Sequence, residues 1–298
     1  MKNIAYLLPF IAATALAADA FDPTYAQHGQ LLVTQFVSAP FPHPSRAEGR
    51  KYKDQLFPAE KHYADRTVAL FIPKGFRASE RVDFVVHFHG WYNTVAGTLR
   101  QFQLIEQLLA SGRNAILIVP EGPHNAPDSA GGKLEDTDGF KRFMAEAIAT
   151  LRTQSVLTQS DFTLGDIILS GHSGGYKVMA AILDRGGLTP NVKEVWLFDA
   201  LYAETDKFLA WADRRPGRLI NIYTDGGGTK DDSEAMMALL KQRGTSFLAT
   251  EEAAVTAGEL RTNSLVFLHT ELGHNEVLAK RKEFELFLKT SCLRENSK

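Results

Sequence analysis

The chain has 298 residues, of which 44% are hydrophobic and 23% charged, and its formal net charge at pH 7 is −2. These values are typical of an ordinary globular protein that is long enough to bury a core. The small net charge gives no electrostatic reason to expect nucleic acid or an anionic membrane as a partner.

The first 20 residues have the pattern of a secretory signal peptide. Lys2 supplies a short basic region, and residues 4–16 are almost entirely apolar. This apolar stretch is too short to span a membrane, so we favour a cleaved signal over the alternative of an uncleaved anchor. We expect the mature chain to begin near Ala18 or Phe21, with no stable membrane insertion after cleavage.

Cysteine usage adds a second indication of compartment. Cys292 is the only cysteine, so no disulfide can form within the chain. A secreted protein without disulfides fits a bacterial periplasm or extracellular space. We therefore predict a signal peptide over residues 1–20 and a single secreted or periplasmic domain over residues 21–298.

From about residue 66, short apolar runs alternate with longer amphipathic ones. This alternation is typical of βα units and a mostly parallel sheet. The expected strands are 67–73, 82–89, 115–120, 165–170, 192–198, 218–224 and 264–268. The expected helices are 97–109, 138–151, 176–183, 205–214, 233–242 and 275–288.

Two segments have a less certain place in this alternation. Residues 21–66 either form leading antiparallel strands or cover the sheet. The loop 121–137, rich in Gly, Pro, Asn and Asp, follows a strand at the sheet edge where ligands bind in α/β proteins. It either shapes a pocket or is a plain surface loop. No insertion is large enough to form a cap domain.

The most informative motif is Gly171-His172-Ser173-Gly174-Gly175, between a predicted strand and a predicted helix. Strand, G-x-S-x-G and helix in that order is the context that a nucleophile elbow requires. The alternative is a glycine-rich turn without chemistry. We predict that Ser173 is a nucleophile.

A serine nucleophile needs a histidine base that is oriented by an acid. Only His269 and His274 follow Ser173, and His274 has more room because it lies in the loop after the last strand. The acid is open between Asp199 and Asp225, which each follow a predicted strand. Asp225 also fits an ordinary Asp-Gly turn, whereas Asp199 lies among apolar residues and needs a partner, so Asp199 is slightly favoured.

An oxyanion requires hydrogen-bond donors, and the backbone N–H of Gly174 is one candidate. The second is the N–H of Gly90 or Trp91, after an earlier strand. We also expect His89 and His172, which are next to these groups, to contact substrate. His87 and His89 suggest a metal pair as an alternative, but no carboxylate lies at ligand spacing nearby, so no metal is expected.

Taken together, these motifs resemble the α/β-hydrolase superfamily over roughly residues 66–290. His89-Gly90-Trp91, the elbow at Ser173 and Gly273-His274 carry the resemblance. It implies a three-layer sandwich with a mostly parallel sheet of about eight strands, no large cap, and a Ser-His-acid triad that needs no cofactor.

The function expected from these residues is a secreted serine hydrolase that cleaves carboxylic esters through an acyl-enzyme. The substrate is then a small-molecule or polymer-borne ester. The alternatives are a peptidase or amidase with the same triad, and a binding protein that has the fold without the activity.

Overall fold

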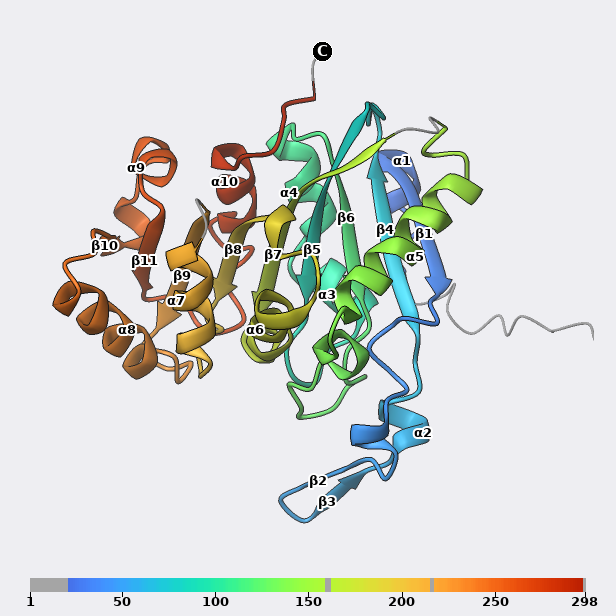
Figure 1. Ribbon diagram of the computed structural model, residues 1–298, viewed down its shortest axis with the longest axis horizontal. Coiled ribbons are helices and arrows are strands. Elements are labelled where there is room, and N and C mark those ends of the chain that lie inside the picture. Colours follow the sequence, from blue (N-terminus) through green and yellow to red (C-terminus); the bar gives the residue numbers. More distant parts are fainter. Residues whose placement is uncertain (1–20, 159–161, 215–216, 297–298) are drawn as a thin grey trace, which may run out of the picture.

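The computed structural model describes residues 21–158, 162–214 and 217–296, and the predicted signal peptide lies outside these ranges. In the described ranges, nine strands form one large sheet (Figure 1), in the order β1-β4-β6-β5-β7-β8-β9-β11-β10. β4 is antiparallel to both β1 and β6, and the other neighbouring strands are parallel. The predicted mostly parallel sheet is confirmed.

The strands agree closely with the apolar runs of the sequence. They are β1 (Gly29–Gln35), β4 (Thr67–Pro73), β5 (Arg81–Phe88), β6 (Ala115–Pro120), β7 (Thr163–His172), β8 (Val192–Phe198), β9 (Arg218–Thr224), β10 (Leu248–Glu251) and β11 (Leu265–Thr270). β1 and β10 were not predicted as individual strands. Both lie at the edges of the sheet, where one side is unpaired and the apolar pattern is weaker.

Helices cover both faces of the sheet (Figure 1). The helices are α1 (Tyr25–His28), α2 (Ala59–His62), α3 (Val95–Gln101), α4 (Leu104–Ser111), α5 (Gly139–Thr153), α6 (Tyr176–Arg185), α7 (Thr205–Arg214), α8 (Lys230–Gln242), α9 (Ala257–Thr262) and α10 (Glu283–Thr290). Short 3₁₀ turns occur at Pro44–Arg46, Gly132–Glu135, Ser173–Gly175, Thr189–Asn191 and Glu252–Ala254.

Two hydrophobic cores lie on opposite sides of the sheet. One core contains apolar side chains of α5, α6, α7 and α8, and the other contains those of α3, α4, α9 and α10. Along β8, Val195 and Leu197 face the first core, while Trp196 and Phe198 face the second. Both faces of this strand are therefore apolar, as expected for an interior strand of a parallel sheet.

Two predicted helices were too long. The helix expected at 97–109 is two helices, because Gln103 has a left-handed backbone with φ 50° between α3 and α4. The helix expected at 275–288 starts only at Glu283, after Lys282 with φ 60°. Apolar spacing continues across both interruptions, so periodicity alone does not reveal them.

The segment between β1 and β4 projects beyond the sheet (Figure 1). It contains α2 and a small antiparallel hairpin of β2 (Arg50–Tyr52) and β3 (Gln55–Phe57), and we call residues 36–66 the projecting lobe. Phe41, Phe57 and Tyr63 of this lobe form a separate apolar cluster with Ala126 and Ala130 of the loop after β6. The lobe therefore packs on that loop. No helix in the described ranges is long and apolar enough to cross a membrane.

Glu283, the first residue of α10, gives the fold a testable pH dependence. It is 1% exposed, and burial raises the pKa of its carboxyl to about 7. An acid whose pKa is raised by folding loses stability as the pH increases from its unfolded pKa through its folded one. Relative to Glu283→Gln, we expect the free energy of unfolding to be lower at pH 8 than at pH 5 by about 2–3 kcal/mol. Urea unfolding at both pH values measures this, and an identical pH dependence in both proteins would contradict it.

Candidate active site

Ser173 lies at the sharp turn between β7 and α6. Its φ is 52°, a left-handed conformation that is uncommon for residues other than glycine. Glycine at the turn is required sterically, because a Cβ on Gly175 would lie 2.7 Å from the carbonyl oxygen of Phe88. The turn therefore has the strained strand-to-helix geometry of a nucleophile elbow.

His274 and Asp199 form a close pair beside this turn. His274 Nδ1 lies 2.6 Å from Asp199 Oδ2, and the Asp199 side chain is fully buried at the end of β8. Asp199 also accepts hydrogen bonds from the hydroxyls of Thr224 and Thr229. Burial raises the pKa of Asp199, but the hydrogen bonds from His274, Thr229 and Thr224 outweigh it and hold the pKa below its ordinary value. Asp199 is thus an ionised acceptor that fixes the orientation of the imidazole.

Asp225, the other candidate acid, is engaged elsewhere. Its carboxylate lies 2.7 Å from Lys230 Nζ and 3.2 Å from His269 Nε2, and its side chain is 62% exposed. His269 Nδ1 in turn contacts Glu251 at 2.9 Å. Asp225 and His269 therefore belong to a surface ion-pair cluster. Of the two candidate acids, only Asp199 contacts His274.

His172 contacts both the backbone and the ring of His274. Its Nε2 lies 2.8 Å from the carbonyl oxygen of His274, and the two rings are 4.6 Å apart. Burial lowers the pKa of His172 to about 3, and nearby His274 acts in the same direction. His172 is therefore neutral and donates from Nε2 to the His274 backbone. It also lines the cavity, so its predicted contact with substrate stays a prediction.

His89 does not have the position expected for a substrate-binding residue. Its Nδ1 lies 2.8 Å from the Gly90 carbonyl oxygen, and its Nε2 accepts from the backbone N–H of Gly122 at 2.9 Å. The ring is buried and is not among the residues that line the cavity at Ser173. Both ring nitrogens are used by the backbone, so His89 holds two loops together.

The predicted oxyanion residues surround Ser173. A Cβ on Gly90 would lie 2.6 Å from Ser173 Cβ and 3.2 Å from Ser173 Oγ. A Cβ on Gly174 would lie 2.7 Å from Trp91 Cδ1, so Trp91 and Gly174 are also close neighbours. Gly90 therefore lies close to the Ser173 side chain, and Trp91 lies close to Gly174.

The close approach at Gly90 leads to a specific prediction. We expect Gly90→Ala to lower kcat by about 10²–10³-fold, because the new methyl group would separate the loop from Ser173 and displace the predicted oxyanion donor. Gly226→Ala is the matched control, since a Cβ there meets nothing within 4 Å. Ester hydrolysis under saturating substrate measures both variants. An unchanged kcat for Gly90→Ala would show that the close approach is not needed.

A cavity of 570 Å³ opens beside Ser173 and His274. Its walls combine aromatic and polar side chains, namely Trp91, Tyr92, Asn93, Gln101, His172, Tyr176, Tyr202, Asn275 and Ser129. Of these residues, the sequence motifs pointed only to Trp91 and His172. The position of Tyr176 directly after the elbow could have predicted that it lines the cavity. Tyr202 and Gln101 lie far from the elbow in sequence and reach the cavity only through tertiary packing.

The loop after β6 helps to shape this cavity. Ser129 lines it and accepts a hydrogen bond from Trp91 Nε1 at 2.8 Å. The neighbouring Asp128 is buried and forms ion pairs with Arg46 and Arg50 of the projecting lobe. Of the two expectations for this loop, the structure therefore supports the pocket-forming one.

Comparisons with known proteins extend this description. No family model and no curated protein sequence matches the chain. Solved structures do match, among them the fluorophosphonate-binding serine hydrolase FphF of Staphylococcus aureus (9% identity, TM-score 0.53, 89% of this chain and 99% of that one). A feruloyl esterase module of Clostridium thermocellum matches with 10% identity and a TM-score of 0.53, over 90% and 91% of the two chains. The S-formylglutathione hydrolase FrmB of Staphylococcus aureus matches with 10% identity and a TM-score of 0.54, over 89% and 100%.

These identities are low, so the likeness concerns the fold. The likeness extends over 89% of this chain and over 99% of FphF and 100% of FrmB. The order of the strands and the sharp turn at Ser173 are consistent with it. The chain has the α/β-hydrolase fold.

Proposed function

We propose that this protein is a serine hydrolase that cleaves carboxylic esters through an acyl-enzyme on Ser173. The observation that carries the proposal is the pairing of His274 with buried Asp199, 2.6 Å apart, because His274 lines the same cavity as Ser173 at its strained turn. A base, an acid that orients it and an exposed hydroxyl are the groups that acyl transfer requires.

In the first half-reaction, Ser173 Oγ attacks the ester carbonyl carbon while His274 Nε2 takes the hydroxyl proton. The carbonyl electrons move to the oxygen, where the backbone N–H groups of Gly174 and of Gly90 or Trp91 stabilise the negative charge. The tetrahedral species then collapses, and His274 gives the proton to the departing alcohol. Asp199 stabilises the imidazolium throughout.

In the second half-reaction, water replaces the alcohol. His274 takes a proton from water as the water oxygen attacks the acyl carbon, and the proton returns to Ser173 Oγ when the acid leaves. All the groups used belong to the chain, so the proposed chemistry involves no cofactor.

The cavity walls give a first indication of substrate. Trp91, Tyr92, Tyr176 and Tyr202 supply aromatic surface, and Asn93 and Gln101 supply polar groups. We therefore favour esters that carry a planar or apolar group on at least one side of the scissile bond. The sequence of residues 1–20 favours action outside the cytoplasm on small or polymer-borne esters.

A fluorophosphonate probe tests the proposal directly. We expect one equivalent to label the folded protein, on the peptide that contains Ser173. Hydrolysis of p-nitrophenyl acetate and of a p-nitroanilide should then be compared under the same conditions, with faster turnover of the ester. Folded protein that neither reacts with the probe nor hydrolyses either substrate would contradict the proposal, and a preference for the anilide would indicate an amidase.

A further inference from the structure

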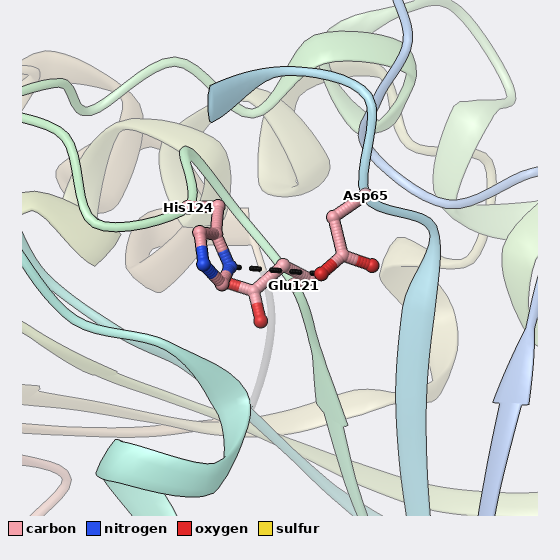
Figure 2. A group of neighbouring side chains, drawn as sticks. All are labelled: Asp65, Glu121 and His124. Atoms are coloured by element: carbon pink, nitrogen blue, oxygen red, sulfur yellow. Dashed lines mark ion pairs between the residues drawn. The ribbon is translucent and has the colours of Figure 1, made fainter. Parts of the chain in front are cut away.

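A second group of chemically active side chains lies at the ends of β4 and β6. Asp65 precedes β4, Glu121 directly follows β6, and His124 lies in the loop beyond it. Figure 2 shows the polar ends of these three side chains turned toward one another. One ligand atom from each residue lies within 4.8 Å of the other two.

Both carboxylates direct an oxygen at the same nitrogen. His124 Nδ1 lies 3.5 Å from Glu121 Oε1 and 3.6 Å from Asp65 Oδ2. Neither His124 Nδ1 nor Glu121 Oε1 has a hydrogen-bond partner, although both atoms are buried. A single N–H cannot point at two oxygens, and neither distance is that of a good hydrogen bond. A cation between the three atoms would satisfy all of them.

Neighbouring groups leave Glu121 Oε1 free for this role. The residue is 2% exposed, and its other oxygen accepts the backbone N–H of Val95 at 2.9 Å. His89 Nε2 is 3.2 Å from Oε1, but it accepts a hydrogen bond from Gly122 and His89 Nδ1 faces the Gly90 carbonyl. His89 Nε2 therefore has no proton to give to Glu121. A buried carboxylate oxygen without a donor is costly unless a cation binds it.

The other two side chains are held in place by the backbone. Asp65 Oδ1 accepts the N–H of Thr67 at 2.8 Å, which leaves Oδ2 for the cluster. His62 fixes the backbone of His124 through two contacts. The backbone N–H of His124 donates to the His62 carbonyl oxygen at 2.9 Å, and the His124 carbonyl oxygen lies 2.8 Å from His62 Nδ1. Outer contacts of this kind orient metal ligands in proteins.

We infer that Asp65, Glu121 and His124 form a divalent transition-metal site, with Zn²⁺ as the best-fitting ion. Bonds of about 2.0–2.2 Å to nitrogen and oxygen in a tetrahedron separate the ligand atoms by about 3.3–3.6 Å. The two measured separations, 3.5 and 3.6 Å, agree with this geometry. An imidazole nitrogen with two carboxylates suits zinc or manganese better than calcium, which prefers oxygen ligands alone. The fourth position is left for water.

The site would stabilise one wall of the cavity. The segment that carries Glu121 and His124 also bonds to the loop after Gly90, through Asn125 N–H to the Asn93 carbonyl and Tyr92 N–H to the Ala126 carbonyl. Tyr92 and Asn93 line the cavity. A bound ion therefore joins the segment before β4 to the loop after β6, behind that wall, and it should raise the thermal stability of the folded chain.

Calorimetric titration of chelator-treated protein with Zn²⁺ alone tests the inference. We expect one equivalent of Zn²⁺ to bind and to raise Tm. Loss of a residue that only hydrogen-bonds a metal ligand typically weakens metal affinity by about 10–100-fold. Because His124 and Asp65 would bind the ion directly, we expect His124→Gln and Asp65→Asn each to weaken zinc binding by more than this. The matched control is His269→Gln. His269 also lies between two carboxylates, but Glu251 faces its Nδ1 and Asp225 faces its Nε2, so the three side chains do not converge on one nitrogen. This variant should bind zinc like the wild type.

Cobalt provides a readout that does not depend on stability. Co²⁺ in a four-coordinate site with a nitrogen ligand gives intense visible absorption, which His124→Gln should abolish even in a variant that is less stable. Zinc binding that survives in both His124→Gln and Asp65→Asn, or that disappears only in His274→Ala, would overturn the inference. So would the absence of stoichiometric binding by the wild type, which would leave His124 as a protonated partner of two carboxylates.

Discussion

Ser173→Ala is expected to lower kcat for ester hydrolysis by about 10⁶-fold, because the variant has no oxygen that can form the acyl-enzyme. The residual rate would come from the oxyanion donors and from substrate binding. Alanine fits the turn, since it adds no atom to the position that serine occupies with φ 52°. Stopped assays with p-nitrophenyl esters, together with fluorophosphonate labelling, measure the loss.

The thermal unfolding temperature is the control for this variant. It should stay close to that of the wild type, so that a loss of activity reports chemistry. Retention of more than a small fraction of kcat in a folded Ser173→Ala protein would place the nucleophile elsewhere. A loss of both folding and activity would be resolved by Ser173→Cys, which keeps a nucleophilic atom and should still react covalently with the probe.

Asp199→Asn is expected to lower kcat by about 10⁴-fold, because an amide favours the wrong tautomer of His274 and cannot stabilise its charged form. The effect should appear in kcat far more than in KM, since Asp199 is buried behind the base and is not among the residues that line the cavity. Steady-state kinetics across several esters measure this. A large change in KM with unchanged kcat would contradict the assigned role.

Asp225→Asn is the matched control for this substitution. Both aspartates directly follow neighbouring parallel strands, but Asp225 is exposed and pairs with Lys230 and His269. We expect kcat to be unchanged, because exposed ion pairs contribute little. The reverse result, with Asp225→Asn inactive and Asp199→Asn active, would overturn the choice of acid.

A local sequence pattern does not distinguish Asp199 from Asp225 as the acid. Each aspartate ends an apolar run, so local pattern treats them alike. The difference comes from Thr224 and Thr229, which bond to Asp199, and from the path of the chain to His274, which lies 75 positions further on. Such contacts depend on tertiary packing and leave no local signal.

The strands and the elbow were predictable because each restricts which residue types can occupy a short stretch of sequence. A buried parallel strand needs a continuous apolar run, and a tight strand-to-helix turn needs small residues beside Ser173. The break at Gln103 depends on a single backbone torsion and was missed. The cluster of Asp65, Glu121 and His124 has no local signal either, because its residues meet only where separate strands end. In the same way, Glu121 lies 3.2 Å from His89 because the two residues follow the neighbouring strands β6 and β5.

The projecting lobe contacts one wall of the cavity beside Ser173. The lobe contains none of the residues proposed for catalysis, yet Tyr52 lies edge-on to Trp91 at 5.3 Å and the Arg50 guanidinium lies 5.9 Å from the Trp91 ring. Trp91 forms part of the cavity wall. Changes in residues 50–57 should therefore alter which esters are accepted, and because the backbone N–H of Trp91 is also a candidate oxyanion donor, they should alter kcat as well. Directed evolution of the proposed hydrolase toward new substrates is best begun in that hairpin.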